Sequence, residues 1–111
     1  MIEPETLFRA LSDPTRLRCL LLVVAEGRLC VCEFVYALEL SQPRVSRHLG
    51  HLRDLGIVQD ERYGQWMHYR LHPELPAWAH LVLEAAGQAE ELRPTRARLA
   101  AMPNRPPAAV E

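Results

Sequence analysis

Two cysteines separated by one residue, Cys30 and Cys32, are the side chains of this 111-residue chain best placed to do chemistry. They fall at the start of an expected helix, where the helix dipole favours the thiolate, the form of cysteine that binds metals. A thiolate pair selects soft, thiophilic ions, and trivalent arsenic or antimony takes a pyramid of three ligands, usually sulfur. Because residues i and i+2 of a regular helix point about 200° apart, a shared ion requires the first helical turn to distort.

The three cysteines also have plainer interpretations, which stay open at this point. Cys30 and Cys32 fit small buried core residues, since free cysteine is among the most buried residue types. Cys19 falls inside another expected helix, and we favour a core or dimer-facing position for it. A disulfide within the pair would close a very small ring, which is awkward in a helix. The acidic N-terminus is unlike a signal peptide, so we expect a cytoplasmic protein with reduced thiols.

Hydrophobic periodicity and turn residues predict the elements that position these thiols. The expected elements are helices at about 4–11, 14–27, 30–38, 42–55 and 77–92, strand-like runs at 57–61 and 66–71, and a last helical piece ending near 102. Asp13 and Ser41 are suitable N-caps, and Gly56 is a suitable C-cap.

This order, α-α-α-α-β-β-α, is mainly helical with a β-hairpin wing. It predicts a winged helix-turn-helix with an added dimerisation helix. We expect residues 1–102 to form one DNA-binding and dimerisation domain, and residues 103–111, which hold three prolines, to be a disordered tail.

The helix expected at 42–55 divides into a buried stripe and an exposed polar face. Val45, Leu49 and Leu52 lie within about 40° of one another on a helical wheel. The opposite face carries arginines and a glycine, which suits the DNA major groove, where base edges present distinct donor and acceptor patterns. The alternative is an ordinary solvated surface helix, but the hairpin that follows favours DNA, because its tip can reach a neighbouring groove.

The residues expected to contact DNA lie at the start of this helix and at the hairpin tip: Ser41, Gln42, Arg44, Ser46, Arg47, His48, Arg62, Tyr63, Gly64 and Gln65. Gln42 and Arg44 stand where such helices usually touch bases, whereas serine hydroxyls and the first backbone N–H groups suit phosphates. His48 lies nearer the buried stripe, so we favour a local hydrogen bond for it over a phosphate contact.

Composition excludes several classes of protein. The net charge of -1 argues against a chain that coats nucleic acid indiscriminately, and the thirteen basic residues, all arginine, must gather on one surface if they meet DNA. No apolar run approaches the length of a membrane-spanning helix. No nucleophile–base arrangement or catalytic carboxylate pair is recognisable, so we expect neither an enzyme nor an organic cofactor.

Several motifs, in order, resemble the ArsR/SmtB family of metal-sensing repressors, and within it the arsenic-responsive branch. They are LSDPTR at 11–16, LCVCEF at 29–34, SQPRVSRHL at 41–49 and GQWMHYRL at 64–71. The resemblance covers roughly residues 4–92, and several motifs in the right order are more specific than any one alone.

The resemblance implies a homodimer joined through its first and last helices, bound to double-stranded operator DNA until As(III) or Sb(III) binds Cys30 and Cys32. Many arsenic-responsive members have a third cysteine three residues after the second, where this chain has Val35. The third ligand is then Cys19, a cellular thiol such as glutathione, or water. A second hypothesis keeps the repressor and makes oxidants or reactive sulfur the signal, acting on Cys19 and the pair.

Overall fold

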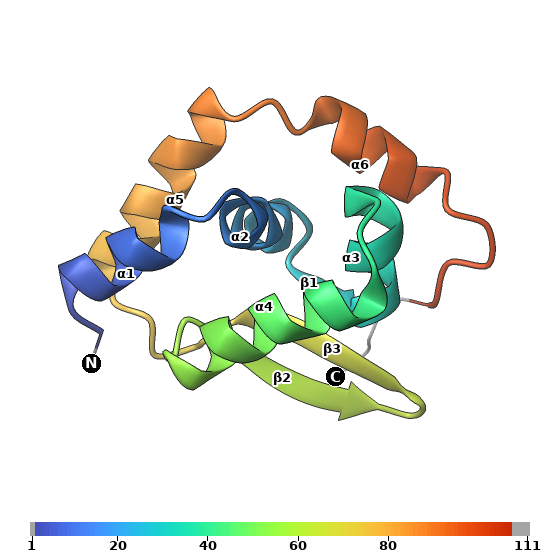
Figure 1. Ribbon diagram of the computed structural model, residues 1–111, viewed down its shortest axis with the longest axis horizontal. Coiled ribbons are helices and arrows are strands. Elements are labelled where there is room, and N and C mark those ends of the chain that lie inside the picture. Colours follow the sequence, from blue (N-terminus) through green and yellow to red (C-terminus); the bar gives the residue numbers. More distant parts are fainter. Residues whose placement is uncertain (1, 108–111) are drawn as a thin grey trace.

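The computed structural model describes residues 2–107, which form helices and one small three-stranded sheet. The elements are α1 (Pro4–Leu11), α2 (Pro14–Glu26), β1 (Arg28–Cys30), α3 (Val31–Leu38), α4 (Gln42–Asp54), β2 (Val58–Tyr63), β3 (Trp66–Leu71), α5 (Ala77–Ala89) and α6 (Arg93–Ala100). Figure 1 looks along α2 and shows the other helices and the sheet arranged around it. The winged helix-turn-helix expected from the sequence is confirmed.

Helix α2 is the centre of the core. Asp13 caps it by accepting hydrogen bonds from the backbone N–H groups of Thr15 and Arg16, as its position predicts. Five consecutive residues on it are almost fully buried: Cys19, Leu20, Leu21, Leu22 and Val23. Burial therefore extends around most of the middle of this helix, although Arg18 and Ala25 are exposed.

The sheet has strand order β1-β3-β2 with antiparallel pairing, and β1 is an element that the sequence did not predict. Gly27, at φ +89°, ends α2 and leads into this three-residue strand. A strand so short shows no alternation that periodicity can detect. The helix expected from about Cys30 therefore begins one residue later, at Val31, because Cys30 pairs with β3 and serves as the N-cap.

The hairpin wing is tighter than predicted. Strand β2 continues to Tyr63, which pairs with Trp66, so only Gly64 and Gln65 form the turn. Gly64 has φ +60°, and a glycine at the first turn position is typical of a two-residue type II′ hairpin. Arg62 and Tyr63 thus belong to the strand and not to the loop.

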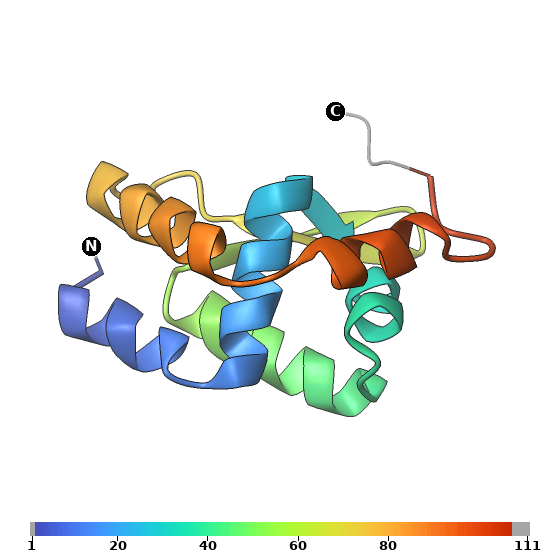
Figure 2. The same cartoon turned by 90° about the horizontal axis from the view of Figure 1, so that it is seen from above.

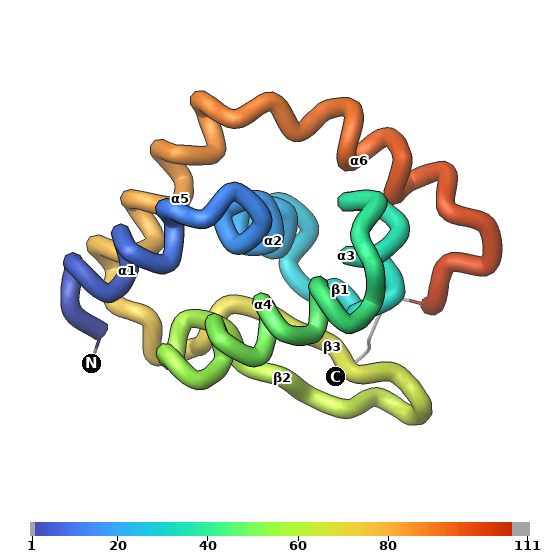
Figure 3. The backbone as a smooth tube through the Cα atoms, in the orientation of Figure 1, coloured from blue at the N-terminus to red at the C-terminus, as the bar shows by residue number. Residues whose placement is uncertain are grey.

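Helices α3 and α4 form the helix-turn-helix, whose path is traced in Figure 3. Helix α3 ends with Glu39 in the left-handed region, and Ser41 begins α4 by accepting a hydrogen bond from the Arg44 N–H. Val45, Leu49 and Leu52 are each fully buried, as predicted.

The C-terminal helices differ in length from the prediction. Helix α5 ends at Ala89, and α6 begins at Arg93 with Pro94 in its first turn, where the missing N–H costs nothing. Helix α6 lies beside α3 (Figure 2), and the Arg98 guanidinium donates to the Ala37 carbonyl over 2.9 Å.

Residues 103–107 form no helix or strand, but Arg105 within them bonds to Glu33. The rest of the expected tail, 108–111, lies outside the described residues. No helix between residues 2 and 107 is long and apolar enough to cross a membrane.

Candidate nucleic-acid interface and thiol site

The cysteine pair lies where β1 becomes α3. Cys30 is the N-cap of α3, with extended backbone at φ -83° and ψ 162°, and Cys32 belongs to the first helical turn. Their Cα atoms are 5.5 Å apart, and the two sulfur atoms are joined in a disulfide. The awkward ring expected for two helical cysteines does not arise in this structure, because only one of the two residues is helical. The sulfur atoms meet without distortion of the helix. That the thiols are reduced in the cell stays a prediction.

Glu33 ties this junction together. Its carboxylate is 5% exposed and accepts a 2.9 Å hydrogen bond from the backbone N–H of Cys30. The same side chain accepts a 2.6 Å bond from Nε of Arg105, and Nη2 of the same arginine lies 3.7 Å from a carboxylate oxygen of Glu26. Arg105 thus links the C-terminal segment to Glu33, the residue in the first turn of α3 that binds the backbone N–H of the N-cap Cys30.

His68 lies directly across the sheet from Cys30 and is 3% exposed. Its Nδ1 atom is buried and makes no hydrogen bond within the described residues. Burial lowers the pKa of this imidazole, although the nearby Glu33 carboxylate acts in the opposite direction. A buried nitrogen without a partner is uncommon and calls for a reason.

Cys19 is separate from the pair. It is fully buried in α2, and burial, with a smaller effect of Asp13, raises the pKa of its thiol to about 12. Within residues 2–107, no group of three or more His, Cys, Asp and Glu side chains is placed to hold a metal ion. The structure therefore does not group Cys19 with Cys30 and Cys32.

The outer face of the sheet carries a polar pocket of about 690 Å³ beside the cysteines, called here the sheet pocket. Its lining residues are Glu26, Gly27, Arg28, Glu33, His68, Arg70, Arg105 and Pro106. The sequence did not predict this pocket, because its lining residues are far apart along the chain. They come from α2, strands β1 and β3, α3 and the C-terminal segment. The pairing of β1 with β3 brings its strand residues together, and the bonds of Arg105 to Glu26 and Glu33 bring in the C-terminal segment.

The exposed start of α4 presents the side chains predicted to contact DNA. Gln42, Arg44 and Arg47 are exposed, and Ser46 is half-buried. The Gln42 amide donates to the Ser46 hydroxyl over 2.8 Å, and the Arg44 guanidinium donates to the Thr15 hydroxyl over 3.4 Å. Such bonds contribute only about 0.5–1.5 kcal/mol net, so DNA can replace them.

His48 is half-buried on the flank of α4. Burial lowers the pKa of its imidazole; Asp13 opposes this, and Arg16, Arg47 and Arg44 add to it. The side chain is accordingly neutral near pH 7, and a cationic phosphate contact is not its natural role. The local hydrogen bond favoured for His48 from the sequence stays a prediction.

The wing splits its predicted DNA residues between two environments. Arg62, Gly64 and Gln65 are exposed. Tyr63 instead lies against the edge of His68, with ring centroids 5.2 Å apart, and beneath the Arg28 guanidinium at 4.9 Å. Tyr63 therefore connects the wing to the sheet face that carries Cys30, and its contact with DNA stays a prediction.

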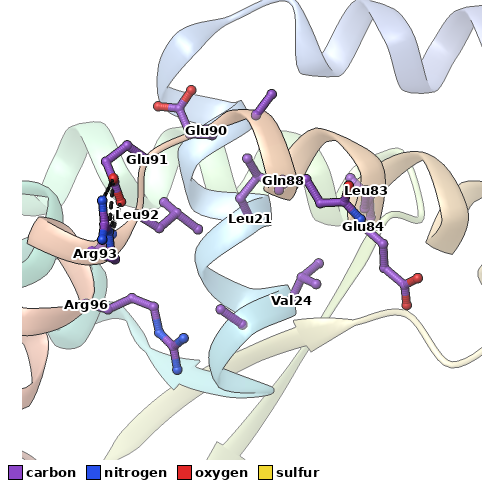
Figure 4. A pocket seen from close by; sticks show the side chains of 13 residues that line it. Leu21, Val24, Leu83, Glu84, Gln88, Glu90, Glu91, Leu92, Arg93 and Arg96 are labelled. Atoms are coloured by element: carbon purple, nitrogen blue, oxygen red, sulfur yellow. Dashed lines mark hydrogen bonds and ion pairs between the residues drawn. The ribbon is translucent and has the colours of Figure 1, made fainter.

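A second pocket lies between α2, α5 and the segment that joins α5 to α6. Leu21, Val24 and Leu83 line it, and charged side chains including Glu90 and Arg96 stand around it (Figure 4). It holds no cysteine and no predicted DNA contact, so we assign it no part in either site.

Two large apolar side chains are exposed on α1 and α5, the helices through which the family resemblance implies a homodimer. Phe8 on α1 is 55% exposed, and Leu81 on α5 is 65% exposed. Both helices lie at the same end of the molecule (Figures 1 and 2).

Comparison with known proteins places this geometry among regulators. Residues 13–60 match the family described as bacterial regulatory protein, arsR family. The chain is 50% identical over 108 residues to the arsenic resistance transcriptional regulator ArsR1 of Pseudomonas putida, covering 96% of this chain and 84% of that protein. It is 47% identical over 88 residues to the arsenical resistance operon repressor of Escherichia coli, covering 79% and 75%. The solved structure of the AntR antimony-specific transcriptional repressor matches with a TM-score of 0.65 at 32% identity, over 74% of this chain and 71% of that one.

Proposed function

Because the chain belongs to the arsR family and is a DNA-binding transcriptional repressor, we propose that it represses an arsenic-resistance operon and leaves operator DNA when As(III) or Sb(III) binds Cys30 and Cys32. The relatives are regulators and not enzymes, as the sequence led us to expect. A repressor must meet chromosomal DNA, so the proposal places it in the cytoplasm.

The convergence of the two sulfur atoms carries this proposal. In the structure they are bonded to each other across a Cα separation of 5.5 Å, so after reduction both can reach one ion. Arsenous acid then exchanges a hydroxide for each thiolate, and each thiol proton leaves with that hydroxide as water. No electron transfer is needed once the disulfide has been reduced, and soft thiolates favour this exchange.

The position of the pair explains how binding would reach the DNA. Cys32 lies in the first turn of α3, which packs on the reading helix α4, and Cys30 lies in β1, which pairs with the wing strand β3. An ion that spreads the two sulfurs shifts α3 relative to β1, and so moves the reading helix relative to the wing. Release requires that the ion bind the DNA-free arrangement better than the DNA-bound one.

We propose that two chains associate through α1 and α5, burying Phe8 and Leu81. A two-fold dimer would present two copies of α4 to successive major grooves on one face of the duplex, which fits a near-palindromic operator.

The test is whether arsenite releases the protein from the DNA upstream of its gene, measured by the fluorescence anisotropy of that labelled DNA. The double variant Cys30→Ser, Cys32→Ser should bind DNA as tightly as the reduced wild type and ignore arsenite. Cys19→Ala is the matched control and should be released normally. Normal release of the double variant would show that the ion binds elsewhere.

The disulfide favours a second candidate function, in which oxidation of Cys30 and Cys32 is itself the signal. This mechanism predicts that the oxidised and reduced proteins differ in DNA affinity without any arsenite. Equal affinity at matched salt would exclude it.

A further inference from the structure

We propose that the sheet pocket binds a low-molecular-weight thiol that carries carboxylate and ammonium groups, and that this thiol supplies the third sulfur of the arsenic centre. The inference rests on the proposed function and names a partner for the same site. Its starting point is that this chain supplies two converging sulfurs to an ion that takes three ligands.

The described chain offers no third thiol at the pair. Cys19 is enclosed in the core by α2, and no third ligand-type side chain is grouped with Cys30 and Cys32 in residues 2–107. Val35, one turn after Cys32 in α3, is aliphatic. The third position is therefore filled from outside the chain.

The sheet pocket adjoins the pair through two of its own lining residues. His68 is the residue opposite Cys30 in the antiparallel register, and directly opposed side chains lie about 5 Å apart at Cβ. Glu33 bonds the backbone N–H of Cys30. A molecule seated against these residues lies beside the strand that carries Cys30, and the proposal directs its thiol toward an ion held by the cysteines.

The charges of the pocket identify the class of molecule. Arg28 and Arg70 both lie against the Glu61 carboxylate. Arg105 binds the carboxylates of Glu26 and Glu33. Three guanidinium groups at the pocket therefore meet three carboxylates, and their charges balance. A guanidinium carries five N–H donors, so an arginine that already holds one carboxylate can bind another. A site with balanced charges of both signs suits a molecule that carries carboxylate and ammonium groups together, and it disfavours a simple oxyanion.

The unpartnered imidazole points to a ligand as well. His68 is 97% buried, and its Nδ1 lacks a hydrogen-bond partner although polar groups surround the pocket. A bound polar molecule would supply the missing hydrogen bond.

The chemistry is a ligand exchange. Arsenous acid loses its three hydroxides, each As–O bond is replaced by an As–S bond, and the three thiol protons leave in three molecules of water. Two sulfurs come from Cys30 and Cys32 and one from the bound thiol. The same class of thiol can first reduce the disulfide through a mixed disulfide and leave as its own oxidised dimer.

The test compares three thiols on the full-length protein, reduced with a phosphine and bound to labelled operator DNA. Arsenite is titrated with glutathione, with neutral 2-mercaptoethanol, or with cationic cysteamine, at matched thiolate concentration. Glutathione should lower the arsenite concentration for half-release by about tenfold or more relative to the others, because binding in the pocket raises the local thiol concentration. S-methylglutathione, which has no thiol, should reverse this effect.

Two arginine variants test whether the preference for glutathione arises in the sheet pocket. Arg105→Gln should remove the preference for glutathione, whereas Arg93→Gln, which alters an exposed arginine outside the pocket, should keep it. Phenylarsine oxide keeps a carbon on arsenic and needs only two sulfurs, so it should release both variants without added thiol.

X-ray absorption should find three As–S bonds with glutathione and two As–S bonds plus one As–O bond without it. Equal half-release concentrations for the three thiols, or an As–O bond that persists with glutathione, would overturn the inference and leave the proposed function intact. Failure of phenylarsine oxide to release DNA would overturn both.

Discussion

Removal of Arg105 should destabilise the fold through Glu33. The Glu33 side chain is 6% exposed, and its carboxylate is held by the Cys30 N–H at 2.9 Å and by Arg105 Nε at 2.6 Å. Removing one partner of a fully buried pair costs about 3–5 kcal/mol. The Arg105 side chain is 34% exposed, so solvent screens the pair and we expect Arg105→Gln to cost about 1–2 kcal/mol.

Thermal unfolding followed by circular dichroism measures this cost. A loss of 1–2 kcal/mol corresponds to a fall of roughly 5–10 °C in Tm for a domain of this size, at fixed protein concentration because dimerisation would shift Tm. Glu33→Gln keeps an acceptor for the Cys30 N–H, so the double variant should be little less stable than Glu33→Gln alone. An unchanged Tm for Arg105→Gln would refute the reasoning. So would a double variant whose loss of stability equals the sum of the losses of the two single variants. Arg93→Gln, whose partner is the exposed Glu91, is the control and should leave Tm unchanged.

Three further predictions concern the reading helix and the core. Arg47→Ala should weaken DNA binding and reduce the slope of log affinity against log salt by about one without a change in Tm; an unchanged slope would mean that Arg47 contacts no phosphate. Because burial lowers the pKa of His48 from 6.5, the unfolded chain takes up its proton first. Stability that is fully present above pH 6.5 should therefore fall as the pH drops through the lower folded pKa, and His48→Gln should flatten that part of the profile; parallel profiles would contradict this. Cys19, with its thiol pKa raised to about 12, should resist alkylation in the reduced native protein and react only after unfolding; rapid native labelling would show that α2 opens.

The reading helix was predictable because its signals are local. A serine N-cap and apolar residues three and four apart fix both the start of α4 and the face that it buries, and Val45, Leu49 and Leu52 fill the core as expected. The hairpin was predictable for the same reason. Its turn was placed too widely, since residues 62 and 63 carry no signal that separates strand from loop.

The surroundings of the thiols were not predictable, because they depend on contacts between distant segments. Cys30 and Cys32 were identified from their spacing, but their backbone was misjudged, since β1 exists only through its pairing with β3. Glu33, His68 and Arg105 reach the site from three separate parts of the chain. No local sequence pattern predicts that these three residues lie together at the thiol site.

The central claim is that an ion held by Cys30 and Cys32 releases this repressor from DNA. The most direct measurement is fluorescence anisotropy of the reduced protein on its upstream DNA, titrated with arsenite beside Cys30→Ser. The account predicts release of the wild type at near-stoichiometric arsenite and no release of the variant. Tight binding by the reduced wild type that persists in excess arsenite would contradict it.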